Sequence, residues 1–151
     1  MFPKILISFI GKTQREFQEA ESHYLKLIKT KLILRPYQTL SHLSENEQIT
    51  KESNILLESV DKDDYLICLD IKGTGFSSEE FAKKISATPP PYKNLHFIIG
   101  GSFGLSEEIK SKADLIISIS PFTLPHQMAK IILLEQIYRS ETIISGKKYH
   151  K

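Results

Sequence analysis

The fold is decided by sixteen consecutive residues, LHFIIGGSFGLSEEIK at positions 95–110. The apolar run at 95–99 is typical of a buried strand, and the glycine-rich residues 100–104 separate it from a helical pattern at 106–112. A strand that passes through a tight turn directly into a helix is half of a parallel βαβ unit. The stretch therefore predicts an α/β protein. It also predicts a ligand position at the carboxyl end of the strand, where glycine lets backbone approach a ligand closely.

The same alternation of strand and helix patterns extends over the whole chain. Further strands are predicted at 5–10, 32–34, 64–70 and 115–119, and helices at 13–29, 45–59, 77–87 and 125–140. Ser77 and Glu80 have the spacing of a capping box at the start of one helix, and residues 72–76 are predicted to form a turn. We expect a single domain, residues 1–151, with a parallel sheet flanked by helices, because the chain is too short for two separate cores.

Composition narrows the class of protein further. With 40% hydrophobic and 25% charged residues, the chain has the profile of a globular protein rather than a disordered one. A net charge of +2 is too small to indicate nucleic-acid binding by itself. The only cysteine, Cys68, excludes a disulfide framework and a cysteine-based zinc cluster, and its apolar neighbours predict a buried thiol. The apolar start of the chain is too short to span a membrane, so we expect a cytoplasmic protein that binds neither membrane nor metal.

The glycine turn fits neither of the common nucleotide-binding motifs. Counted from Gly100, a dinucleotide fingerprint would need glycines where this chain has Ser102 and Leu105. A P-loop is excluded because no Gly-Lys-Ser/Thr follows. The turn by itself is compatible with a ligand site and equally with a tight turn that binds nothing.

The C-terminal segment carries a second group of functional signals. The helix that begins near Pro125 has apolar residues on almost every side, which predicts that part of its surface is buried against a second copy of the protein. Glu135 and Arg139 have the spacing of an ion pair within that helix. His126 could cap the helix, take part in catalysis or contact a substrate. The basic, aromatic tail at 147–151 could be a solvated end, or it could hold a phosphate and stack on a base.

Five ordered blocks of the chain together resemble the RlmH family of SPOUT-class methyltransferases. The blocks begin with Leu69-Asp70-x-x-Gly73 and end with Tyr149-His150. Between them lie Ile98-Ile99-Gly100-Gly101-Ser102-x-Gly104-Leu105, Ser118-x-Ser120-x-x-Thr123-Leu124-Pro125-His126-Gln127-Met128 and Glu135-Gln136-x-Tyr138-Arg139. The similarity covers the whole chain, and the order and spacing of the blocks make it specific.

The resemblance implies a fold, a cofactor and a substrate. The family has an α/β fold with a C-terminal trefoil knot, acts as a homodimer and binds S-adenosylmethionine in the knot. Its reaction methylates N3 of pseudouridine 1915 in 23S rRNA, on a substrate similar to an assembled ribosome. By matched position, the cofactor would contact Leu69, Gly100, Ile119, Ser120, Pro121, Phe122, Thr123 and Leu124.

The resemblance also assigns roles to the C-terminal residues. His150 is the candidate base for the N3 proton, Arg139 the candidate cation and Tyr149 a stacking or orienting group. His126, Lys147 and Lys148 are expected to contact the RNA. Three alternatives stay open from the sequence: a knotted methyltransferase that acts on tRNA, an rRNA-binding module without catalysis, and a flavodoxin-like enzyme with a small-molecule substrate.

Overall fold

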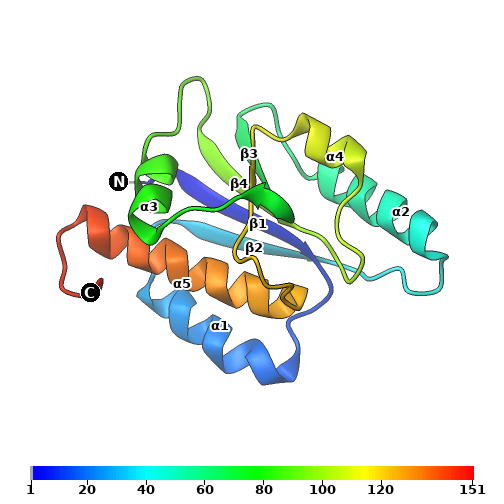
Figure 1. Cartoon of the computed structure of the whole chain (residues 1–151), viewed down its shortest axis with the longest axis horizontal. Helices are drawn as coiled ribbons and strands as arrows, with labels where there is room; N and C mark the ends of the chain where they lie inside the picture. Colours follow the sequence, from blue (N-terminus) through cyan, green and yellow to red (C-terminus); the bar gives the residue numbers. More distant parts are fainter. Residues whose placement is uncertain (1) are drawn as a thin grey trace.

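A five-stranded parallel sheet lies between two layers of helices in the computed structural model, which describes residues 2–151 (Figure 1). The strand order is β2-β1-β4-β3-β5, and every neighbouring pair is parallel. The strands are β1 (Lys4–Ile10), β2 (Leu32–Tyr37), β3 (Asp64–Thr74), β4 (Asn94–Ile99) and β5 (Leu115–Ile117). The helices are α1 (Arg15–Leu27), α2 (Glu45–Glu58), α3 (Ser78–Ser86), α4 (Glu107–Lys112) and α5 (His126–Ile144). Within this part of the chain, no helix combines the length and apolar character needed to cross a bilayer.

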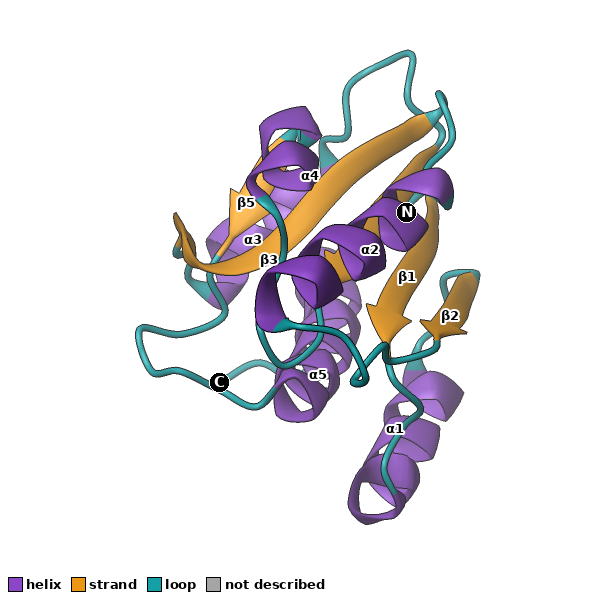
Figure 2. Ribbon diagram, turned by 90° about the vertical axis from the view of Figure 1, so that its right-hand side faces the viewer, coloured by secondary structure: helices purple, strands orange, loops and turns teal. Residues whose placement is uncertain are grey.

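The helices divide between the two faces of the sheet, as Figure 2 shows. Helices α1, α3 and α5 pack on one face, where Phe97 of β4 and Leu133 of α5 belong to the larger hydrophobic cluster. Helices α2 and α4 cover the other face, where Leu56 and Ile109 pack against Ile98. Because both faces are covered, the central strands are mostly apolar, and the predicted α/β class is confirmed.

Two local predictions from the sequence are confirmed in detail. The Ser77 hydroxyl accepts a hydrogen bond from the backbone N–H of Glu80, and the Glu80 carboxylate accepts one from the backbone N–H of Ser77. This capping box starts α3. Cys68 is fully buried, and burial raises the pKa of its thiol to about 12, so it remains a neutral, hydrophobic group.

Four predicted boundaries were wrong. Strand β2 continues to Tyr37 rather than ending at 34, because it pairs with β1 as far as Ile10, and Pro36 is tolerated at the edge of the sheet. Residues 72–76 do not form a separate turn, because β3 continues to Thr74 and pairs there with Ile117. Position 73 of this strand holds a glycine because a β-carbon there would lie 2.6 Å from the backbone carbonyl carbon of Ile117. The last strand ends at Ile117 rather than at 119, and α5 continues to Ile144 rather than ending at 140. Helix α5 stops where Gly146 adopts a φ of +68° and lets Lys147 N–H bond back to Thr142.

A buried hydrogen-bond network links three strands of the sheet. Its members are a serine, a histidine and an aspartate, bonded in the same order as in a hydrolase catalytic triad. The Ser8 hydroxyl lies 2.8 Å from His96 Nε2, and His96 Nδ1 lies 2.7 Å from the Asp64 carboxylate. Since a carboxylate only accepts, Nδ1–H donates to Asp64 and Nε2 accepts from Ser8. Ser8 and His96 are 0% exposed and Asp64 is 3% exposed, so no substrate can reach the hydroxyl. The network therefore joins strands β1, β3 and β4 and performs no catalysis.

This network makes the stability of the protein dependent on pH. Burial lowers the pKa of His96 below its ordinary 6.5, although the bond to Asp64 acts in the opposite direction. Burial raises the pKa of Asp64, but the hydrogen bonds that its carboxylate accepts from Asp61 and Asn94 and from His96 bring it below its ordinary 3.8. The folded protein thus holds a neutral His96 that the unfolded chain protonates below pH 6.5. Its contribution to stability is present at neutral pH and is lost as the pH falls.

We expect the free energy of unfolding to decrease between pH 7.5 and pH 5.5, by at most about 1.4 kcal/mol per pH unit for this one proton. His96→Gln should lower stability at pH 7.5 and flatten the decrease, because the titrating group is gone. His42→Gln, at an exposed loop position, is the matched control. Urea unfolding at both pH values measures the slopes, and an unchanged slope in His96→Gln would contradict the role of this histidine.

Candidate functional site

A cavity of about 750 Å³ opens at the carboxyl ends of β3, β4 and β5. Its size is within the range of sites for small organic ligands. Three chain segments supply most of the wall: one lies within the second half of β3, one follows β4 and one follows β5. The lining residues are 69–71, 99–104, 118–120 and 122–126 together with Ala129. The glycine turn therefore lies where the sequence predicted a ligand position, at the carboxyl edge of a parallel sheet.

The segment after β5 is held in a fixed shape by short-range hydrogen bonds. The Ser118 backbone N–H donates to the Thr74 carbonyl over 2.9 Å, which extends the contact between β3 and β5. The Ser118 hydroxyl donates to the Ser120 carbonyl over 3.0 Å, and the Ser120 hydroxyl accepts from the Phe122 N–H over 2.9 Å. Such side-chain bonds replace the backbone pairing that a loop lacks. These bonds fix the shape of one wall of the cavity.

The glycine turn after β4 forms the opposite wall. Gly101 and Gly104 face each other in an isolated bridge, and the Gly104 N–H donates to the Gly101 carbonyl over 3.0 Å. A β-carbon at Gly100 would lie 2.7 Å from the backbone of Gly104, so no side chain fits there. Behind the turn, the buried carboxylate of Glu52 lies 2.7 Å from a β-carbon position on Gly101 and accepts from the Leu40 N–H. Close packing on both sides fixes this turn.

The structure brings together most of the residues predicted to bind the cofactor. The cavity is lined by Leu69, Gly100, Ile119, Ser120, Phe122, Thr123 and Leu124, while Pro121 is exposed and does not line it. His126, predicted to contact substrate, lies in the same wall as the first residue of α5. Asp70 and Phe103 also line the cavity but were not predicted. Their signal was their position, since Asp70 ends the predicted strand 64–70 and Phe103 lies within the glycine turn.

The C-terminal tail folds back on the last turns of α5. The Arg139 guanidinium donates to the Glu135 carboxylate at 2.6 and 2.9 Å and to His150 Nδ1 at 3.2 Å, which confirms the predicted ion pair. His150 Nε2 lies 2.7 Å from the Glu79 carboxylate on α3, and Tyr149 donates to Glu135 over 3.2 Å. The hydrogen bond from His150 lowers the pKa of Glu79, and the bond to Glu135 raises the pKa of Arg139. These five side chains are the tail cluster.

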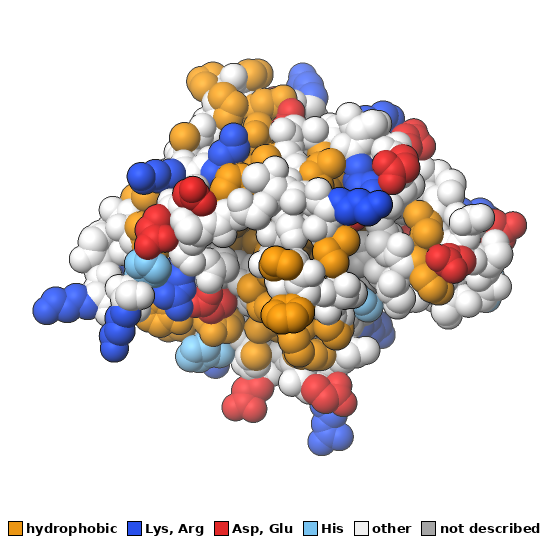
Figure 3. Space-filling model, viewed as in Figure 1, with side chains coloured by type: hydrophobic (Ala, Val, Ile, Leu, Met, Phe, Trp, Pro, Cys, Tyr) orange, Lys and Arg blue, Asp and Glu red, His pale blue; other side chains and the backbone are white. Residues whose placement is uncertain are grey.

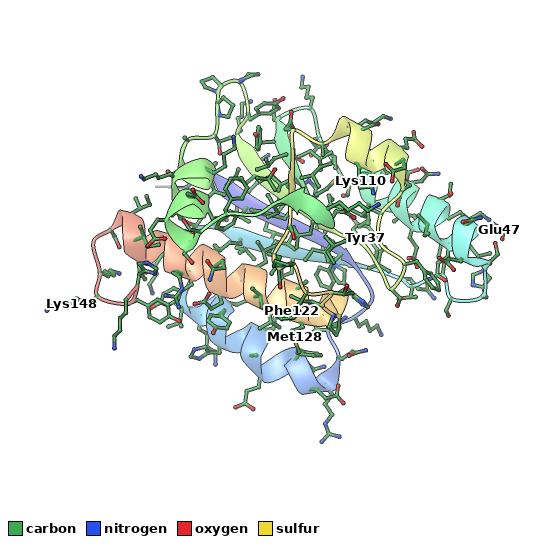
Figure 4. The ribbon with its side chains drawn as sticks, viewed as in Figure 1. Tyr37, Glu47, Lys110, Phe122, Met128 and Lys148 are labelled. Carbon is green, nitrogen blue, oxygen red and sulfur yellow. The ribbon has the colours of Figure 1, made fainter. Side chains whose placement is uncertain are left out.

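The tail cluster and the cavity lie at opposite ends of α5. Arg139 follows His126 by 13 residues, which corresponds to about 20 Å along a helix axis. Figure 4 shows Phe122 and Met128 beside the start of α5 and Lys148 beyond its other end. Within one chain, Arg139, Tyr149 and His150 therefore do not reach the cavity that Leu69 and Gly100 line. The predicted helix at 125–140 already implies this separation, since His126 and Arg139 lie near its two ends.

An apolar patch surrounds the mouth of the cavity. Phe122 is 81% exposed, and Ile71, Phe103 and Met128 are also exposed. In Figure 3 hydrophobic side chains gather near the centre of the face shown, the region in which Figure 4 labels Phe122 and Met128. Exposed apolar side chains grouped around a cavity are typical of a surface that a partner or ligand covers. Lys147 and Lys148 are exposed at the tail.

The fold and the cavity together are those of an α/β protein that binds a small organic ligand. A parallel α/β sheet with a preformed cavity at its carboxyl edge, lined by apolar side chains and loop backbone, suits a small organic cofactor. Among residues 2–151, no group of three or more His, Cys, Asp or Glu residues is placed to hold a metal ion.

The chain belongs to the SPOUT methyltransferase family, because the family profile described as "Predicted SPOUT methyltransferase" matches residues 3–150. It is similar to proteins named "Ribosomal RNA large subunit methyltransferase H" from several bacteria. The protein of Dictyoglomus thermophilum is 40% identical over 97% of this chain and 98% of its own length. That of Streptococcus suis is 38% identical over 98% and 99%, and that of Caldicellulosiruptor saccharolyticus 38% over 91% and 93%. The sequence-based assignment to this group of methyltransferases is confirmed.

Proposed function

We propose that this protein transfers a methyl group from S-adenosylmethionine to N3 of pseudouridine 1915 in 23S rRNA, on the assembled ribosome in the cytoplasm. The observation that carries the proposal is the cavity at the carboxyl edge of the sheet, in a chain that matches its relatives over nearly their whole length. The name that the relatives carry supports ribosomal RNA of the large subunit as the substrate. The modified nucleotide and its position rest on the resemblance in sequence.

The cavity has the chemistry that S-adenosylmethionine requires. Apolar side chains such as Leu69, Ile119 and Leu124 suit an adenine ring, and loop backbone offers hydrogen-bonding groups to its edge. The carboxylate of Asp70 lies in the wall, where it would favour a cationic ligand. When bound, the cofactor supplies an already activated methyl group on a sulfonium centre. The protein's own residues then have to position the acceptor nitrogen, exclude water and remove one proton.

The distance between cavity and tail cluster supports a homodimer with composite sites. If two copies pack around a two-fold axis with their α5 helices antiparallel, the tail cluster of one copy lies beside the cavity of the other. The exposed Phe122 and Met128 next to the cavity would be buried in that contact. A dimer of this kind assembles each site from two chains. We also propose the trefoil knot of the family, with the segment after Ile117 threaded beside the end of β3.

The tail residues are assigned to the RNA side of the site. Arg139 provides a cation beside the uracil-like ring, Tyr149 can stack or orient it, and His150 provides a polar group held by Arg139 and Glu79. Lys147 and Lys148, which are exposed, can contact backbone phosphates. His126, at the start of α5, contacts the nucleotide from the cavity side. The roles of Arg139, Tyr149, Lys147, Lys148 and His126 were predicted from the sequence and remain predictions, whereas His150 was predicted to be the base.

Gene deletion followed by mass spectrometry of 23S rRNA tests the proposed function. We expect N3 methylation of pseudouridine 1915 to disappear and to return when the wild-type gene is supplied on a plasmid. Methylation that persists in the deletion strain, or that is lost from a tRNA instead, would contradict the proposal. Calorimetry with S-adenosylmethionine distinguishes the non-catalytic alternative, because an rRNA-binding module without catalysis would not bind the cofactor.

A further inference from the structure

Methylation at N3 of a uracil-like ring requires a group that removes the N3 proton. The nitrogen loses this proton as it forms its bond to the methyl carbon, and a positioned side chain accelerates such a transfer. Two histidines belong to the proposed composite site, His126 in the cavity wall and His150 in the tail cluster. Their hydrogen bonds differ in a way that separates their roles.

Both ring nitrogens of His150 are occupied. A guanidinium can only donate, so His150 Nδ1 accepts from Arg139 over 3.2 Å. Nε2–H must then donate to the Glu79 carboxylate at 2.7 Å. The lone pair that could take a proton is already used by Arg139. In this arrangement His150 holds the tail in place and would accept a proton only after leaving Arg139.

His126 has the opposite arrangement. It is half-buried and lines the cavity, and neither of its ring nitrogens forms a hydrogen bond with any residue in the described range 2–151. Its Nε2 lies 3.8 Å from a β-carbon position on Gly11, at the end of β1. A glycine there leaves space beside the ring nitrogen. His126 therefore lines the same cavity as the cofactor residues and carries an imidazole whose lone pair no other side chain in that range uses.

The charged groups around His126 keep the imidazole neutral. Burial lowers its pKa below the ordinary 6.5, and the positive charge of Lys130 on the same helix lowers it further. Lys130 is itself paired with Glu21 of α1 at 2.7 Å. The carboxylate of Glu52, from α2, acts in the opposite direction but more weakly. At pH 7 the ring is thus unprotonated, which is the form that a base requires.

Building on the function proposed above, we propose that His126 is the catalytic base of this methyltransferase and that His150 is a positioning residue. The N3–H bond breaks and the proton passes to His126. The N3 electron pair forms the bond to the methyl carbon, and the electrons of the carbon–sulfur bond stay on sulfur. The products are the N3-methylated ring, a neutral thioether and an imidazolium that returns its proton to solvent. No other reactant is needed.

Single-turnover methylation of ribosomes lacking the modification, followed from pH 5.5 to 8.5 with saturating S-adenosylmethionine, tests the proposal. His126→Gln keeps a polar group of similar reach but removes the basic nitrogen. We expect it to slow methylation about 10²- to 10⁴-fold at pH 7 and to abolish the fall in wild-type rate below pH 6.5. His150→Gln should reduce the rate but retain that fall. His42→Gln, on an exposed loop, should match wild type in both.

A measurement on the wild-type protein without substrate tests the same proposal independently of activity. In ¹⁵N NMR spectra, the ring of His126 should be neutral at pH 7, protonate only below pH 6.5, and shift when S-adenosylhomocysteine is added. The signal of His42 should not respond to that ligand. A protonated His126 at pH 7, or one that ignores the ligand, would overturn the proposal even if the Gln variant failed to fold.

Two results distinguish a wrong base from a wrong function. If wild-type protein methylates N3 but His126→Gln keeps the acid limb of the pH profile, the base assignment is wrong and the function stands. If wild-type protein leaves N3 unmodified, the proposed function fails and the assignment of His126 fails with it.

Discussion

Two inactive variants should recover methylation when they form mixed dimers. Arg139→Ala removes the cation of the tail cluster and its bonds to Glu135 and His150, and we expect a loss of about 10²- to 10³-fold in single-turnover rate. Gly100→Ala disables the cavity wall. If the tail of one copy completes the cavity of the other, a mixed dimer contains one intact site. Purified mixed dimers should therefore show about half of wild-type activity, because one of their two sites is intact.

Co-expression with two affinity tags and sequential purification provides the mixed dimers for this measurement. Arg15→Ala is the matched control, because Arg15 is exposed at the start of α1, and it should leave the rate unchanged. Cofactor binding by Arg139→Ala should also equal that of wild type, because Arg139 is assigned to the RNA side of the site and not to the cofactor. If the tail served its own cavity, the mixed dimer would hold two defective sites. No recovery of activity would therefore contradict the composite site.

The sequence predicted the sheet well because its strands are buried on both sides. Residues 95–99 and 64–70 read as mostly apolar runs, and the folded protein needs them mostly apolar for the same reason. The end of β3 was missed because the glycines at 73 and 75 are typical of a turn. Gly73 is instead required by the close approach of Ile117, which lies 44 residues away and leaves no local pattern.

In the site, too, features that depend on neighbouring residues were predicted, and contacts between distant elements were not. The glycine turn was predicted because it follows a strand directly, and residues 119–124 were assigned to the cofactor by the resemblance. The contact between Glu79 and His150 was not predicted, because Glu79 looks like any acidic residue in the first turn of a helix. Likewise, nothing in the order of residues reveals that His126 lacks hydrogen-bond partners within residues 2–151 while both nitrogens of His150 have them. Such properties arise from packing between elements.

Gly100→Ala should weaken cofactor binding about 100-fold or more. The added methyl group would lie 2.7 Å from the backbone carbon and oxygen of Gly104 and 3.0 Å from the Leu105 side chain. Backbone cannot yield as a flexible side chain does, so the turn must shift as a whole. The bridge between Gly101 and Gly104 carries that shift into the cavity wall. Overpacking of this kind also costs about 1–3 kcal/mol of stability.

Gly75→Ala is the matched control for this substitution. Gly75 follows β3 at the same edge of the sheet, yet a β-carbon there meets nothing within 4 Å. The control should bind S-adenosylmethionine as wild type does and unfold at the same urea concentration. Calorimetry measures affinity and urea unfolding measures stability, so a loss of binding can be compared with a loss of folding. If Gly100→Ala binds the cofactor as tightly as Gly75→Ala, the methyl donor does not occupy this cavity, and the wall formed by the glycine turn has only a structural role.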